Sequence, residues 1–468
     1  QLLTFLVGVL NTFVGPPAEG VVRDYRQKDG ALVAFGSLEK VLKKKKEYRT
    51  SLETLLMQHV LPEFDSPVAF MRSRACWMMQ HYVDIKFSRR EHLLMCLRGT
   101  LRALQDPCLP VQIEAASALK FMIELDGTEE TLLPVLPQIL NEYFRIMREI
   151  GSDVVVVALE VIIDRFRDHI GPHAVTLTQK LSEYFTAYAK EGYDDDDAAM
   201  AAGQCIEAVA TVLYSVHTVP SLYPEMERHI LPMLRLVLGN EGEFIEYLEN
   251  ALDVVTYLTY YGPGISPDLW TLFPMIYDAF SNWAYDYITN MATPIDNFVS
   301  RGSDGLLTGR SPAGMPYVEM VLRMAQKVLE DRRQTEPEQR TAAQMLMCVM
   351  HSCKGRVDAY LPAVLGIVLG RLQGVALPPL KVSLLETVAS ALHYSPALTF
   401  EWMKSAGATQ LLLSELFLAL QENHFKTRLG KKLVALGLSS FFALAPSAMP
   451  PEVAANLGLV VSGVVGVV

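Results

Sequence analysis

The sequence has 468 residues, of which half are hydrophobic and a fifth are charged, and its formal net charge is −11. This composition argues against a disordered chain, and the length exceeds the roughly 250–300 residues at which a single hydrophobic core stops growing. The six cysteines are scattered without a Cys-x-x-Cys pair, so we expect thiols in a reducing compartment rather than a disulfide or metal framework.

The stretch 101–122 predicts a helical hairpin. An apolar run ends at Asp106-Pro107, and a second helix is expected from about Pro110. One face of that helix carries apolar residues at i, i+4, i+7, i+8 and i+11, namely Val111, Ala115, Ala118, Leu119 and Met122. Because one hairpin cannot bury such a face alone, copies of it are expected on both sides.

The same five-position face recurs along the chain at intervals of 40 to 54 residues. It can be placed with starts at Ala31, Met71, Val111, Val154, Ala198, Phe244, Ala284, Glu338, Lys381 and Val434. A period of about 40–47 residues with two helices each is typical of HEAT and armadillo repeats. The predicted fold class is therefore all-α, a HEAT-repeat α-solenoid, with residues 1–468 forming one continuous array of about nine to ten hairpins.

The two ends of the sequence and one internal segment do not follow this pattern. Residues 1–13 lack the basic region and cleavage site of a signal peptide, and the apolar stretch 456–468 is shorter than the roughly 20 residues of a membrane span. Solenoid ends normally carry polar caps, so both ends are expected to be cuts through a longer chain. Residues 301–316 are rich in Gly and Ser and predict a flexible loop insertion.

Catalytic and cofactor motifs are not found. Gly171-Pro172 interrupts the helix that would place His169 and His173 on one face, and the Cys348-x-x-His351-x-Cys353 group ends a long apolar helix, where core cysteines are the usual interpretation. Phosphate-binding glycine loops and a nucleophile elbow are missing as well. We expect neither an enzyme nor a metal or cofactor site.

Charge is the most informative feature. Residues 191–300 contain 17 acidic side chains and only two basic ones, Arg228 and Arg235, a net charge of −15 that leaves +4 for the rest of the chain. Two groups stand out in a predicted hairpin turn and on a helix predicted from about Glu243. They are Asp194, Asp195, Asp196 and Asp197, and Glu243, Glu246, Glu249 and Asp253. We interpret both groups as binding sites for basic partners.

Simpler interpretations account for part of this pattern. Acids at a helix start satisfy free N–H groups and the helix dipole, which explains one or two of the four aspartates, and a polar helix face is usually just solvated. The basic tetrad Lys43–Lys46 is interpreted as a helix end, because nucleic-acid binding would need a longer basic stripe with interleaved aromatics. No direct nucleic-acid partner and no membrane insertion are expected.

Several stretches resemble the importin-beta superfamily of nuclear transport receptors, and within it the importin-seven/importin-eight subgroup. They are KDGALVAFGSLEKVLKKKKEY (28–48), HVLPEFDSPVAFMRSRACWMMQHY (59–82), PVQIEAASALKFMI (110–123), GYDDDDAAMAAG (192–203), EFIEYLENALDVVTYLT (243–259), DLWTLFPMIYDAFSNWAYDYITNM (268–291) and CKGRVDAYLP (353–362). The resemblance is strongest over about residues 25–125 and 240–295 and is thin after 395.

The resemblance implies a right-handed superhelix whose second helices line a concave face, with the acids of 194–197 and 243–253 binding basic cargo such as ribosomal proteins or histones. It also implies release of cargo by Ran-GTP, contacts with FG nucleoporins and importin-beta as a candidate partner, and shuttling between cytoplasm and nucleus. The N-terminal Ran-binding region of the family is not found, and the 301–316 loop does not follow the subgroup's pattern. Two alternatives stay open: a HEAT scaffold subunit of a protein complex, and an export receptor of the same superfamily.

Overall fold

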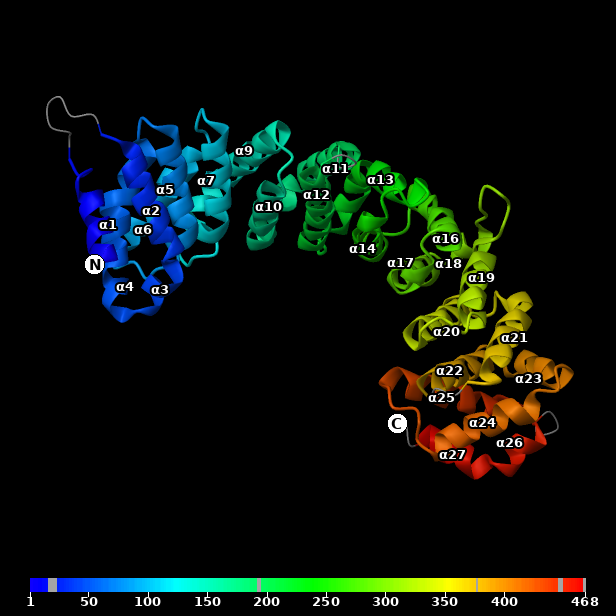
Figure 1. Cartoon of the computed structure of the whole chain (residues 1–468). Helices are drawn as coiled ribbons and strands as arrows, with labels where there is room; N and C mark the ends of the chain where they lie inside the picture. Colours follow the sequence, from blue (N-terminus) through cyan, green and yellow to red (C-terminus); the bar gives the residue numbers. More distant parts are fainter. Residues whose placement is uncertain (16–22, 192–194, 376–377, 445–448, 466–468) are drawn as a thin grey trace. The chain divides into compact units, whose positions relative to one another are not determined.

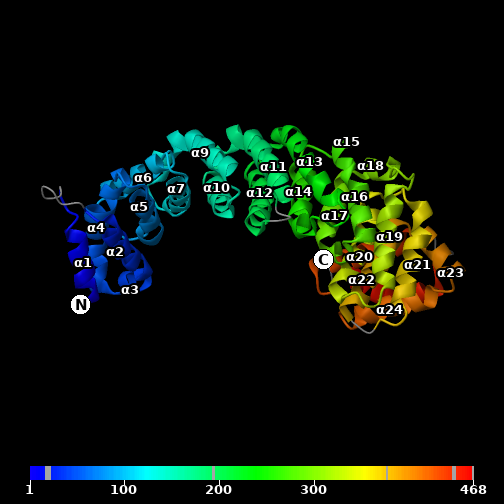
Figure 2. The ribbon, with the colours of Figure 1, turned by 45° about the horizontal axis from the view of Figure 1, so that its top comes forward.

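Helices stacked side by side make up the computed structural model, which describes residues 1–15, 23–191, 195–375, 378–444 and 449–465 (Figures 1 and 2). No β-strand occurs in these ranges, and a single isolated bridge joins Arg310 to Pro316. The chain divides into two compact units, Gln1–Ile230 and Leu231–Val468.

The first unit holds twelve labelled helices and the start of a thirteenth that crosses the unit boundary. They are α1 (Leu2–Asn11), α2 (Tyr25–Ser37), α3 (Glu39–Lys44), α4 (Lys46–Leu55), α5 (Ala69–Tyr82), α6 (Arg90–Ala103), α7 (Leu109–Met122), α8 (Glu129–Leu132), α9 (Leu136–Glu149), α10 (Asp153–Arg165), α11 (Ala174–Glu191), α12 (Asp196–Ser215) and α13 (Tyr223–Gly239).

The second unit continues with helices of similar length, separated by short turns. They are α14 (Leu248–Tyr261), α15 (Pro267–Trp270), α16 (Leu272–Asn282), α17 (Ile288–Arg301), α18 (Ser303–Thr308), α19 (Tyr317–Glu330), α20 (Glu336–Ser352), α21 (Leu361–Leu372), α22 (Pro378–Tyr394), α23 (Pro396–Ser405), α24 (Thr409–Gln421), α25 (Arg428–Ser439), α26 (Pro451–Ala455) and α27 (Leu457–Val465).

The repeated apolar face predicted from the sequence lies on a row of neighbouring helices in each unit. In the first unit α2, α5, α7, α10 and α12 contact one another in that order; in the second unit α14, α17, α20, α22 and α25 do so. In α7 the five predicted positions are fully buried, because each helix of the row packs between two neighbours. The predicted all-α HEAT solenoid is therefore confirmed.

A second row completes each hairpin. In the second unit α16, α19 and α21 contact one another in order, and α19 also packs against α20 as α21 does against α22. In the first unit α11 packs extensively against α12. By length and composition α12 could cross a membrane, but half of its apolar window is buried in the structure, as expected for a core helix of a stacked array.

The expectation of a loop at 301–316 is wrong for residues 303–308, which form α18. Its glycines allow close packing: a Cβ at Gly305 would lie 2.5 Å from the ring of Trp270, which stacks on Tyr317 at 5.4 Å between ring centroids. Leu306 of α18 is fully buried. Glycine at this position allows the close approach of an aromatic ring. The flexibility of residues 301–316 stays a prediction, which tryptic cleavage at Arg301 and Arg310 would test.

The lysine tetrad spans two helices rather than one helix end. Lys43 and Lys44 end α3, whereas Lys46 begins α4. Lys43 donates to Glu39 at 2.8 Å and also pairs with Asp84 at 2.5 Å. Extended backbone at Lys45 separates the helices, and part of the tetrad's charge is compensated within the first unit.

Candidate acidic binding surface

The first predicted acidic group lies at the start of α12, in the turn that follows α11. Asp195 caps the helix, because its side chain accepts a hydrogen bond from the backbone N–H of Asp197 at 3.0 Å. Asp196 and Asp197 occupy the first turn, and all three are exposed; Asp194 lies outside the described residues. Capping therefore explains one aspartate, and the other two leave their charge in solvent.

The second group does not lie on one helix, as the sequence had suggested. Glu243 belongs to a turn and Glu246 to a 3-10 segment, Ile245–Tyr247, while α14 begins only at Leu248. Glu241 and Gly242 have positive φ angles (50° and 91°), and the non-helical backbone of Phe244 (φ −114°, ψ 35°) keeps Glu243 outside the helix. The predicted apolar face is nevertheless buried at Phe244, Leu248, Ala251, Leu252 and Val255.

Glu249 and Asp253 are four residues apart on α14 and therefore share one helix face. Glu249 lies in the first turn, where the helix dipole favours an acid. Partial burial raises the pKa of Asp253, and the neighbouring charge of Glu249 raises it further. The free protein thus holds two like charges together without a compensating cation, an arrangement that a basic partner would relieve.

The two predicted groups lie in different compact units, because Asp195–Asp197 precede and Glu243 to Asp253 follow the boundary at 230/231. Within the second unit, the structure brings Glu249 and Asp253 together on one face of α14. Their placement on a concave face stays a prediction.

The described acids from Asp195 to Asp296 share a property beyond their number. Glu227 aside, none of them forms an ion pair with a Lys, Arg or His side chain of the described chain. The nearby cations bind neutral groups: Arg235 donates to the Thr271 hydroxyl at 3.1 Å, and Arg301 donates to the Gly262 carbonyl at 2.8 Å. The region therefore contains an excess of acids, and cations of the described chain do not compensate them, Glu227 aside.

Two acids that the sequence had not singled out belong to this unpaired set. Glu241 lies in the turn after α13, and Asp278 lies on α16 and has its pKa raised by partial burial. Both contributed to the count of 17 acids, but no local pattern distinguished them from the others.

Metal and cofactor chemistry finds little support in the side-chain arrangement. Within the described ranges, no group of three or more His, Cys, Asp or Glu side chains could hold a metal ion. The six cysteines are free, and burial raises the pKa of the Cys348 thiol strongly. The described side chains of the acidic region can offer charge and hydrogen-bond acceptors to a partner.

Comparison with known proteins gives consistent relatives. The chain is 32% identical to the importin beta-like SAD2 homolog of Arabidopsis thaliana over 97% of its length, and 30% identical to a probable importin-7 homolog of Dictyostelium discoideum over 96%. It is also 30% identical to importin-8 of Homo sapiens over 80% of the chain. The chain spans 44%, 42% and 36% of these relatives, respectively. No family model matches.

Solved structures agree with the fold. Lph2, described as a bidirectional nuclear transport receptor in S. cerevisiae, superposes with a TM-score of 0.74 at 12% identity, covering 99% of this chain and 49% of that one. The cargo-free exportin Cse1 gives a TM-score of 0.69, also at 12% identity, with the same coverage. The family is not enzymatic, as the sequence predicted. The importin-7 and importin-8 relatives show that the chain belongs to the importin-beta family, and the solved structures agree with its fold.

Proposed function

We propose that this chain is part of a nuclear import receptor that binds basic protein segments, such as those of ribosomal proteins or histones, through the acids of residues 195–296. The observation that carries the proposal is that the acids of this region, Glu227 aside, form no ion pair with a cation of the described chain. Carboxylates without internal cations are available to Lys and Arg side chains of a partner. In the full-length protein, Ran-GTP would release the cargo as the receptor shuttles between cytoplasm and nucleus.

The electrostatics favour many weak contacts over a few strong ones. Exposed ion pairs each contribute about 0–1 kcal/mol, so affinity must be summed over an extended stacked surface. A surface with one sign of charge also steers an oppositely charged segment and speeds its association. Because exposed charges are screened over about 8 Å at physiological salt, binding should weaken as salt rises.

The test compares variants that each remove two or three acids, for binding to a histone-tail peptide at low and physiological salt. One variant carries Asp195→Asn, Asp196→Asn and Asp197→Asn; a second carries Glu249→Gln and Asp253→Asn. The control replaces three acids of the first unit that already have partners. Glu129, Glu130 and Asp164 pair with Arg165, Arg90 and Arg167, respectively. We expect weaker binding in both test variants and little change in the control.

Equal, salt-independent affinity in all variants would contradict the proposal and would mean that the acids are only solvated surface side chains. The direction of transport needs the full-length protein, used to capture partners with and without Ran-GTP. Loss of basic cargo on adding Ran-GTP supports an import receptor. Cargo held only with Ran-GTP would indicate an exporter, and a fixed partner indifferent to Ran would indicate a scaffold.

A further inference from the structure

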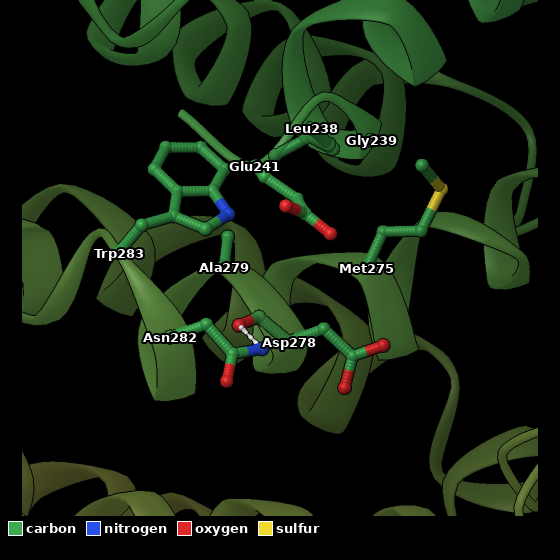
Figure 3. A pocket seen from close by; sticks show the side chains of 8 residues that line it. All are labelled: Leu238, Gly239, Glu241, Met275, Asp278, Ala279, Asn282 and Trp283. Carbon is green, nitrogen blue, oxygen red and sulfur yellow. Dashed lines mark hydrogen bonds between the residues drawn. The ribbon is translucent and has the colours of Figure 1, made fainter. Parts of the chain in front are cut away.

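A pocket of about 720 Å³ lies within the second unit, between the end of α13 with its following turn and α16 (Figure 3). Its size falls in the range of about 300–1,000 Å³ that is usual for ligand sites. Figure 3 shows Glu241 on one side of the space and Asp278 with Asn282 on the other, while Trp283 and Met275 stand at its two ends. Among the described residues that line it there is no Lys, Arg or His.

The polar groups of this pocket have few partners in the described chain. Neither Glu241 nor Asp278 forms an ion pair there, and the indole N–H of Trp283 donates no hydrogen bond to a described residue. Asn282 is held by the backbone, because its side-chain amide donates to the carbonyl oxygen of Asp278 at 2.9 Å. Two carboxylates that lack a cationic partner in the described chain therefore border the same cavity as an aromatic ring.

The pocket is built by close packing rather than by a loose loop. A Cβ at Gly242, where φ is 91°, would lie 3.3 Å from the ring of Trp283, so the missing side chain leaves room for the indole against the turn. At Gly239 a Cβ would lie 3.2 Å from the terminal methyl of Met275. Trp283 itself follows directly after α16, whose buried residues anchor it in the helix row.

From the cavity, its aromatic wall and its unpaired carboxylates, we propose that this pocket binds an arginine side chain of a basic protein segment, with the guanidinium stacked on Trp283 between Glu241 and Asp278. An aromatic face attracts a cation through its quadrupole, most strongly for tryptophan. A planar guanidinium can stack on the ring and donate hydrogen bonds sideways to carboxylates, which a lysine ammonium cannot do together. The inference rests on the proposed function, because it assigns one anchor to the basic partner.

The test uses three fluorescently labelled Gly/Ser peptides of one length that carry arginine, lysine or citrulline at the same positions. Citrulline keeps the planar shape of arginine and removes its charge. We expect the wild-type chain to bind the arginine peptide most tightly and the citrulline peptide most weakly. Binding should also quench the fluorescence of one of the four tryptophans, and Trp283→Phe should abolish that part of the signal.

Substitutions then distinguish the contribution of the Trp283 ring to the affinity from that of the two carboxylates. Trp283→Leu should lower the affinity for the arginine peptide by about fivefold to thirtyfold, the size of one cation–π contact, and Trp283→Phe should lower it less. Glu241→Gln and Asp278→Asn should both weaken binding. The matched control is Asp286→Asn, an exposed acid in the corresponding turn after α16 that does not line the pocket; we expect a change of about twofold or less.

Two failures can be told apart. Suppose that the arginine peptide binds in a salt-dependent way and that the triple variant of Asp195, Asp196 and Asp197 weakens it. If Trp283→Leu and Asp278→Asn do not, the pocket is not the anchor and the proposed function stands. If the wild-type chain binds no basic peptide, the proposed function fails with it. Because Glu241 and Asp278 are exposed, their variants keep the test valid even if Trp283→Leu destabilises the fold.

Discussion

Residues 24–183 and residues 195–296 are both built of packed helices, but their acidic side chains differ in whether they form ion pairs. In the earlier region ion pairs recur from hairpin to hairpin, such as Arg74 with Asp29, Arg72 with Asp106 and Arg90 with Glu130. In the later region the described acids, Glu227 aside, have no such partner. The same repeat can therefore be held together with or without internal charge compensation.

This difference indicates that acids which stabilise the fold and acids which are available to a partner lie in different regions. A compensated acid supports its neighbour and presents little net field, whereas an uncompensated acid adds only repulsion until a cation arrives. The apolar faces of α14 and α17 stack without help from ion pairs, as shown by their fully buried Leu248, Ala251, Ile288 and Met291. The stacking of these helices therefore does not require ion pairs from the acids of this region, as the proposed binding of a basic partner assumes.

The largest expected effect comes from breaking a buried pair in the earlier region. Lys28 donates to Glu63 at 2.6 Å, and their side chains are only 3% and 9% exposed. Lys28→Met should lower the free energy of unfolding by about 3–5 kcal/mol, because it leaves Glu63 charged and buried. Urea unfolding followed by circular dichroism measures this value.

The matched variant carries Lys28→Met together with Glu63→Leu. It should recover much of the lost stability, because replacing both members of a buried pair by apolar side chains is often neutral. A loss below about 1 kcal/mol in the single variant would mean that the pair is solvated and that the contrast between the two regions is weaker than the contacts indicate.

The pH dependence of stability should have opposite signs in the two regions. The hydrogen bond and charge of Arg72 hold the pKa of Asp106 below its ordinary 3.8, so its contribution is complete above that value and is lost as the pH falls through the lowered pKa. Burial and Glu249 raise the pKa of Asp253 above 3.8. The folded chain then binds the proton more tightly, and this group's contribution falls as the pH rises from 3.8 through the raised pKa.

Urea unfolding of the wild type, Asp106→Asn and Asp253→Asn across the acidic range measures both contributions. The deficit of Asp106→Asn should shrink as the pH falls, whereas any advantage of Asp253→Asn should grow as the pH rises. Parallel curves for the two variants would show that Asp253 is compensated after all.

Much of the fold could be predicted because each repeat is local in sequence. Starts such as Met71, Val111 and Glu338 lie within α5, α7 and α20, since a buried helix face leaves a spacing that can be read without tertiary information. The helix expected from about Glu243 begins only at Leu248, because Phe244 has a non-helical backbone and Ile245–Tyr247 form a 3-10 segment, which the apolar spacing does not reveal.

The parts that could not be predicted depend on residues far apart in sequence. Gly302 and Gly305 suggested a loop, but they face Trp270 on a neighbouring helix. Glu241 and Trp283 form one pocket across two hairpins, and neither the acid count nor a helical period brings them together. The number of acids marked the region in the sequence, whereas the proposed arginine pocket could be found only in the packed structure.

The smallest expected effect also tests the comparison most directly. Glu249 and Asp253 are like charges at i and i+4 on α14, a spacing that destabilises a helix by about 0.2–0.5 kcal/mol. Asp253→Asn should therefore raise the free energy of unfolding by about that amount while weakening the binding of a basic peptide. Asp164, on α10, pairs with Arg167 at 2.7 Å, and Asp164→Asn should instead lower stability slightly and leave peptide binding unchanged. Opposite signs in both measurements would mean that the acids of residues 195–296 are held at a cost in stability, as expected for groups that serve a partner. If Asp253→Asn destabilises the chain as Asp164→Asn does, its carboxylate has a structural role, and the basic segment must be bound by other acids of the region.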